Sequence, residues 1–153
     1  MSTSSTLIGT ENFTLNITQE TLVRATITQT FEALLEQLGP ANENEQGVKM
    51  SMKIEPWPGG RWFRDLGDNN GHLWAHVQSI KRPTLLEMWG PLFMSFGAVS
   101  NVQYRLSEVE GGTLIKFHHK ALGMFEEQQR QGMNRGWAHM LAGARAIAER
   151  KAK

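Results

Sequence analysis

Apolar and polar side chains alternate along several short stretches of the chain, which is typical of strands in a sheet with one buried and one exposed face. The clearest alternation lies in VKMSMKIE, residues 48–55, where every second side chain is apolar. The same criterion predicts one long strand or two short ones at residues 13–27. Further strands are expected at residues 61–65, 72–80, 85–89, 101–107 and 113–121. Glycine-containing turns such as PGG and GDNNG separate the strands, which should therefore pair as antiparallel neighbours.

Two other segments have the spacing of an amphipathic helix. The first is expected at residues 28–39, with Thr28 or Thr30 as its N-cap and Gly39-Pro40 at its end. The second is expected from Phe125 to Lys151. Its apolar face consists of Met133, Trp137, Met140, Leu141, Ala144, Ile147 and Ala148.

Three glycines, Gly132, Gly136 and Gly143, lie beside the apolar face of this second helix. Each glycine inside a helix costs roughly 1 kcal/mol relative to alanine. Three of them on one side indicate that something approaches the helix backbone closely there, either the sheet or a ligand.

The order of elements is a strand, a helix, a run of antiparallel strands and a long C-terminal helix. A sheet with one dry face and a helix with one apolar stripe bury both surfaces when the sheet curves around the helix. We therefore expect an α+β fold in which a curved antiparallel sheet of about six or seven strands wraps around the C-terminal helix. Such an arrangement commonly leaves a cavity between the two. Residues 1–12 are expected to form a flexible segment, and residues 13–153 a single domain.

Composition excludes several classes of function. The 153 residues include no cysteine, which excludes disulfides, thiolate metal sites and a cysteine nucleophile. The 16 basic and 15 acidic residues are scattered and give a net charge of +1, so no surface for nucleic acid or an anionic membrane is expected. The polar start lacks a signal-peptide pattern, and no apolar run approaches the ~20 residues of a membrane span. We expect a cytoplasmic protein that is not associated with a membrane.

The histidines do not have the spacing of a metal site. His72 and His76 lie about 13 Å apart along one predicted strand, and His118 and His119 face opposite ways on another. Nucleophile-elbow and phosphate-loop motifs are absent from the sequence. We therefore expect no metal and no cofactor.

Acid–base chemistry in a cavity remains an alternative. His119 shares its predicted strand face with Ile115 and Phe117, so it should point inward, where burial lowers the pKa of an imidazole. Tyr104, the only tyrosine, can reach the same space. The competing interpretation is a core histidine with one hydrogen-bond partner and a core tyrosine with its hydroxyl at the rim.

Methionines and aromatic residues are the larger signal, with eight methionines and five tryptophans in the chain. Methionine is flexible and suits adaptable apolar surfaces, although ordinary core filling explains the same residues. The residues expected to line a ligand cavity are Met50, Met52, Phe63, Met88, Phe93, Tyr104, Phe117, His119, Met133, Trp137 and Met140.

The motifs EPWPGGRWFRD, GHLWAHVQSIKRPTLLEMWGPLF and GGTLIKFHHKALG, in this order, resemble the START-like (SRPBCC) superfamily with its helix-grip fold. More narrowly, they are similar to the branch that contains the C-terminal domain of the activator of heat-shock-protein-90 ATPase. The resemblance spans Glu20 to Lys151 and implies a cavity for hydrophobic small molecules. It also implies that Leu73, Ala75 and Val77 face inward, and that Trp74 shields an edge or contacts a partner.

Three functional hypotheses follow. The first is non-enzymatic binding of a small hydrophobic molecule between the sheet and the C-terminal helix. The second is a co-chaperone-like interaction domain with an exposed face around Trp57, Trp62 and Trp74. The third is an enzyme, such as a cyclase or hydrolase, that uses His119 and Tyr104 in the cavity. An exposed edge strand would also permit a protein partner or a homodimer.

Overall fold

The computed structural model describes residues 13–153 and has two helices and one sheet. The elements in chain order are β1 (Thr14–Val23), α1 (Ile27–Leu38), β2 (Met52–Ile54), β3 (Arg61–Gly67), β4 (Asn70–Lys81), β5 (Leu85–Gly90), β6 (Ala98–Val109), β7 (Gly112–Gly123) and α2 (Glu127–Lys151). The strands form one antiparallel sheet in the order β1-β7-β6-β5-β4-β3-β2. The expected flexibility of residues 1–12 concerns a segment outside the described residues.

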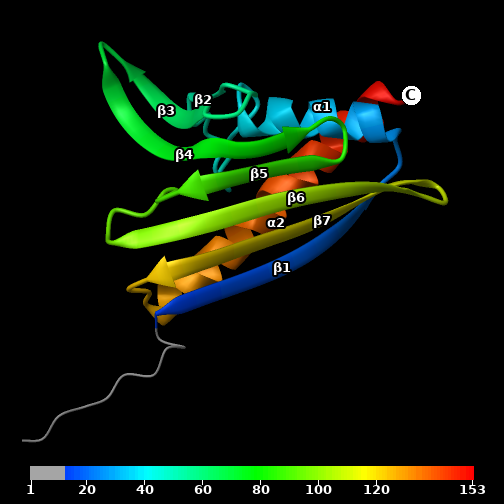
Figure 1. Cartoon of the computed structure of the whole chain (residues 1–153). Helices are drawn as coiled ribbons and strands as arrows, with labels where there is room; N and C mark the ends of the chain where they lie inside the picture. Colours follow the sequence, from blue (N-terminus) through cyan, green and yellow to red (C-terminus); the bar gives the residue numbers. More distant parts are fainter. Residues whose placement is uncertain (1–12) are drawn as a thin grey trace, which may run out of the picture.

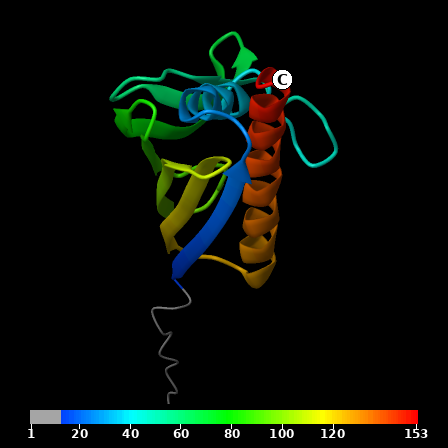
Figure 2. The same cartoon turned by 90° about the vertical axis from the view of Figure 1, so that its right-hand side faces the viewer.

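The sheet curves around α2, which runs diagonally across one of its faces (Figures 1 and 2). Along β6 and β7, most side chains that point toward α2 are buried, and those that point away are exposed or half-buried. The apolar stripe of α2 that the sequence predicts is buried as a whole. The α+β helix-grip fold is therefore confirmed.

Helix α1 begins earlier than its sequence pattern predicts. Its N-cap is Thr26, whose hydroxyl accepts a hydrogen bond from the Gln29 amide while the Gln29 side chain accepts one from the Thr26 amide. This reciprocal pair is a capping box. The expected cap at Thr28 or Thr30 is wrong, because Thr26 and Ile27 already belong to the helix start and not to a strand.

The structure differs most from the sequence-based prediction at residues 48–55, where a longer strand was expected. Only Met52–Ile54 forms β2, and Val48 is 59% exposed. The residues before β2 belong to the preceding loop instead. The Met50 amide donates a hydrogen bond to the Asn42 carbonyl, and Ser51 has a φ of 53°, which a strand does not allow. Alternation of apolar residues produced a strand only where β3 supplies a partner.

A bulge in β4 changes which side chains face inward. Trp62 pairs with Ala75 and Phe63 pairs with Leu73, so Trp74 is an extra residue between the two pairs. As a result Trp74 and Ala75 are both buried, whereas Leu73 is exposed. The inward orientation expected for Ala75 and Val77 is confirmed, and that expected for Leu73 is wrong.

Candidate functional site

The space between α2 and the sheet is filled by aromatic rings centred on Trp137. Its ring centroid lies 4.6 Å from that of Phe117, 6.0 Å from that of Phe93 and 6.4 Å from that of Trp62. Trp62 is fully buried and donates its indole N–H to the Leu38 carbonyl at 2.7 Å. These rings occupy the middle of the region where the sequence predicts a cavity.

His119 is buried beside Trp137 and has both ring nitrogens engaged. The Trp137 indole donates to His119 Nδ1 at 3.0 Å, and His119 Nε2 lies 2.8 Å from Ser100 Oγ. An indole N–H can only donate, so Nδ1 must be the acceptor and Nε2 must carry the proton that is donated to Ser100. Desolvation, assisted by the nearby charge of His118, lowers the pKa of His119 to about 4. The imidazole is therefore neutral at pH 7.

Tyr104 is equally enclosed. Its ring lies 4.9 Å from that of Phe117, and its hydroxyl is buried without a hydrogen-bond partner among the described residues. Burial raises the pKa of this phenol above its ordinary value. Neither Tyr104 nor His119 presents a free polar atom to an open surface.

The open apolar site lies on one flank of α2, next to this aromatic core. It is a groove of about 310 Å³, which we call the glycine groove. Its lining consists of Asn42, Glu43, Asn44, Glu45, Gln46, Met50, Trp74, Phe93, Gly132, Gly136, His139 and Met140. The loop at residues 42–46 and His139 supply the polar residues of this lining.

Two aromatic side chains shape the glycine groove. The β4 bulge brings in Trp74, and the segment after Gly90 brings in Phe93, whose ring stands edge-on to Trp74 at 5.6 Å. Gly90 allows this approach because a Cβ there would lie 2.5 Å from the Trp74 carbonyl oxygen.

The glycines of α2 have two different environments. A Cβ on Gly136 would meet nothing within 4 Å, and one on Gly132 would meet only the end of the Arg135 side chain at 3.8 Å. A Cβ on Gly143 would lie 3.1 Å from Gln37 Cγ on α1. Packing within the protein therefore accounts for Gly143, but it does not account for Gly132 or Gly136.

The residues that the sequence predicts as cavity lining fall into three groups. Met50, Phe93 and Met140 lie in the glycine groove, and Met133 lines an adjoining groove that shares Phe93 and Gly132 with it. Phe63 lies apart, in a polar groove of β3 and β4, with the Arg61 guanidinium 4.4 Å from its ring centroid. The remaining members are buried in the core: Met52, Met88, Tyr104, Phe117, His119 and Trp137.

Several groove residues were not named by the sequence pattern. Trp74 depends on a bulge, and Asn42 and His139 depend on how the 42–46 loop packs against α2. The glycines of α2 were the one feature of the sequence that indicated this groove, because glycines destabilise a helix unless a close neighbour or a ligand requires them.

The tryptophan face expected for a co-chaperone-like domain is wrong. Trp57 is 54% exposed, but Trp62 and Trp74 are buried and their rings lie 5.0 Å apart in an edge-on arrangement. The β4 bulge turns Trp74 inward, and its pairing with Trp62 removes both from the surface.

Neither a metal site nor a membrane span is found in residues 13–153. Nowhere in this part of the chain do three histidine, aspartate or glutamate side chains gather closely enough to hold a metal ion. Neither α1 nor α2 combines the length and apolar character needed to cross a membrane.

Solved structures share this fold at low sequence identity. An uncharacterised protein from Rhizobium leguminosarum has a TM-score of 0.69 and 16% identity, over 90% of this chain and 95% of that one. A protein of unknown function from Staphylococcus aureus, SA2116, has a TM-score of 0.65 and 15% identity, over 94% and 98% of the two chains. The di-domain ARO/CYC StfQ of the steffimycin biosynthetic pathway has a TM-score of 0.66 and 11% identity. The alignment covers 94% of this chain and 53% of StfQ.

Comparison with curated protein sequences gives no match. Among protein families, the one described as Activator of Hsp90 ATPase homolog 1-like protein matches residues 24–149, which include every lining residue of the glycine groove. The chain therefore belongs to the Activator of Hsp90 ATPase homolog 1-like family, within the START-like (SRPBCC) superfamily.

Proposed function

We propose that this protein binds a small apolar molecule in the glycine groove without converting it chemically. The observation that carries the proposal is the open space at Gly136, where a side chain would meet no protein atom within 4 Å. Two glycines that weaken α2 without serving its packing are explained if a ligand lies against the helix backbone there. Family membership supports a ligand-binding domain.

The apolar part of the groove suits a ligand of limited size. Met50 and Met140 are flexible and polarizable, and Trp74 and Phe93 offer aromatic surface. The volume of about 310 Å³ lies at the lower end of the range for small-molecule sites, roughly 300–1,000 Å³. We therefore infer a ligand with one to three rings, held mainly by apolar contact, with the polar residues of the lining at its margin.

Binding without catalysis is favoured by the state of the two candidate catalytic residues. His119 uses both nitrogens within the protein, and the Tyr104 hydroxyl is enclosed. A general acid or base must come within hydrogen-bond reach of the reacting group. Access to either residue would require the aromatic rings around Trp137 to separate.

The test combines identification of a bound molecule with a substitution in the groove. Native mass spectrometry of gently purified protein should show a bound apolar molecule, and titration with the neutral fluorophore N-phenyl-1-naphthylamine should saturate at one site. Gly136→Leu should raise the dissociation constant of this probe more than tenfold. Gly136→Ala should raise it several-fold, while increasing the free energy of unfolding by roughly 1 kcal/mol because alanine favours the helix.

Gly143→Ala is the matched control, because it makes the same change on the same helix outside the groove. It should leave the affinity for the probe unchanged. Equal affinity in Gly136→Leu and the unaltered protein, or no saturable binding together with no co-purified molecule, would contradict the proposal.

A further inference from the structure

Strand β1 forms one edge of the sheet, and every second residue on it points its backbone groups outward. The Phe13 carbonyl accepts a hydrogen bond from the Gly123 amide at 2.8 Å, so odd-numbered residues of β1 face β7. In an antiparallel strand the N–H and C=O of one residue point to the same side. The even-numbered residues of β1 therefore direct both groups away from the sheet.

Side chains of α2 cover the two ends of this edge. Arg130 donates to the Thr14 carbonyl, and the Arg24 amide donates to Glu149 Oε1 at 3.1 Å. Between these ends, no described residue bonds the outward backbone groups of four exposed residues. They are Asn16, Thr18, Glu20 and Leu22.

The usual protection of an edge strand is absent from β1. Natural edges are often shortened, bulged, or blocked by proline or lysine. β1 has ten residues in unbroken register with β7, contains neither proline nor lysine, and carries one charge, at Glu20. The opposite edge, β2, has three residues, one of them Lys53.

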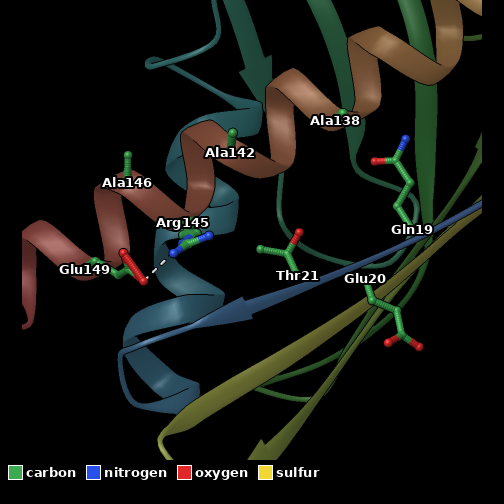
Figure 3. A pocket seen from close by; sticks show the side chains of 8 residues that line it. All are labelled: Gln19, Glu20, Thr21, Ala138, Ala142, Arg145, Ala146 and Glu149. Atoms are coloured by element: carbon green, nitrogen blue, oxygen red, sulfur yellow. Dashed lines mark hydrogen bonds and ion pairs between the residues drawn. The ribbon is translucent and has the colours of Figure 1, made fainter.

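A groove of about 540 Å³, the edge groove, runs beside this open stretch, between β1 and α2. Figure 3 shows Gln19 and Thr21 pointing from β1 toward the helix and Glu20 pointing away. The helix offers only small side chains along much of the groove: Ala138, Ala142 and Ala146. The groove therefore leaves room for the inward-facing side chains of an added strand.

We propose that the added strand is β1 of a second copy of this chain, paired antiparallel about a two-fold axis at Gln19. In this register Asn16 lies opposite Leu22 of the second copy, and Thr18 lies opposite its Glu20. All four open residues then find a partner, and the contacts of Arg130 and Glu149 at the two ends stay in place.

Three features favour a second copy over another extended segment. The open stretch from Asn16 to Leu22 is centred on Gln19, so in two copies related by a two-fold axis each open residue lies opposite another open residue. The charge of Glu20 faces a threonine instead of a second carboxylate, so no like charges stand directly opposite one another. A two-fold contact of one patch with itself is also the commonest symmetry of soluble assemblies. The proposal is independent of the glycine groove, which lies on a different flank of α2.

The oligomeric state tests the proposal directly. Sedimentation equilibrium of the full chain should give twice 17.2 kDa at high concentration and dissociation on dilution. Thr18→Pro should raise the dissociation constant of the dimer at least tenfold. The Thr18 N–H points to solvent in the single chain, so proline removes only the bond to the second copy. Thr18→Val keeps that N–H and should remain a dimer.

Cross-linking tests the register. Gln19 faces itself across the axis at a non-hydrogen-bonded position, where Cα atoms lie about 4.5 Å apart, within reach of a disulfide. The chain has no cysteine, so Gln19→Cys should give a single oxidised dimer, whereas Thr21→Cys should give little. A 17.2 kDa species at all concentrations, an unaltered dimer in Thr18→Pro, or equal cross-linking of both cysteine variants would overturn the proposal. Probe binding by Thr18→Pro should equal that of the unaltered protein, which separates this test from that of the glycine groove.

Discussion

His119 joins the sheet to the helix through a single imidazole. Its ring accepts from Trp137 on α2 and donates to Ser100 on β6, while the residue itself belongs to β7. Both bonds require the neutral tautomer with the proton on Nε2. Protonation would turn Nδ1 into a donor facing another donor, and it would place a charge among apolar rings.

The stability of the protein should depend on pH through His119. The pKa of His119 falls from an ordinary 6.5 to about 4 on folding, so the unfolded chain binds the proton more readily. The stability associated with the neutral ring is complete above pH 6.5 and is lost as pH falls toward 4. The full loss is of the order of 3 kcal/mol.

Urea unfolding of the unaltered protein and of His119→Gln, at intervals between pH 7 and 4.5, measures this dependence. The variant should be less stable at pH 7, because it loses the fitted imidazole, and its stability should change less over this range. Parallel curves for the two proteins would show that His119 does not contribute the dependence. Carboxylates such as Asp65 and Glu149, whose pKa values are lowered by hydrogen bonds from Lys53 and from the Arg24 backbone respectively, titrate at lower pH and in both proteins.

Single residues also show how far the sequence could predict the site. Alternation along β7 correctly turned His119 inward, since strand periodicity decides the face. Its partner Trp137 lies 18 residues away on another element, and no local pattern specifies that contact. Trp74 could not be placed because an extra residue in β4 reverses the alternation on which the prediction depended.

At the scale of elements, the start of α1 depends on the capping box of Thr26 and Gln29. Thr26→Ala should lower the free energy of unfolding by about 1 kcal/mol, because it leaves the Gln29 N–H without its acceptor. Thr28→Ala is the matched control, since Thr28 is exposed and lies two residues after the N-cap, within the helix. It should be neutral or slightly stabilising in the same urea titration. An equal loss in both variants would contradict the assignment of the cap.

The sequence predicts which segments form helices or strands and in what order, but it predicts their first and last residues less well. The long strands and both helices follow their hydrophobic period, because each presents one face to a common core. The alternation at residues 48–55 also satisfies the strand pattern, yet a strand needs a hydrogen-bonded neighbour, and β3 reaches only Met52–Ile54. The glycine groove partly results from this shortening, since Met50 lies in the loop that borders it.

At the scale of the whole molecule, the aromatic core is closed and the tryptophans divide into two classes. Trp57 and Trp89 are 54% and 49% exposed, whereas Trp62, Trp74 and Trp137 are buried. Iodide should therefore quench only part of the tryptophan fluorescence. In the double variant Trp57→Phe/Trp89→Phe the remaining emission should be blue-shifted and nearly insensitive to iodide. Strong quenching in that variant would indicate a water-filled cavity between α2 and the sheet.

The two edges of the sheet differ in length, ten residues in β1 and three in β2, and this inequality limits growth. A sheet with two long open edges can add copies on both sides and extend into a filament. In the sheet of residues 13–153, β1 is the one long edge, and it is occupied when two copies join. The outer margins of the joined sheet are then the two short β2 strands. Association through β1 therefore stops at the dimer, so the unpaired backbone groups of this edge do not lead to a fibre.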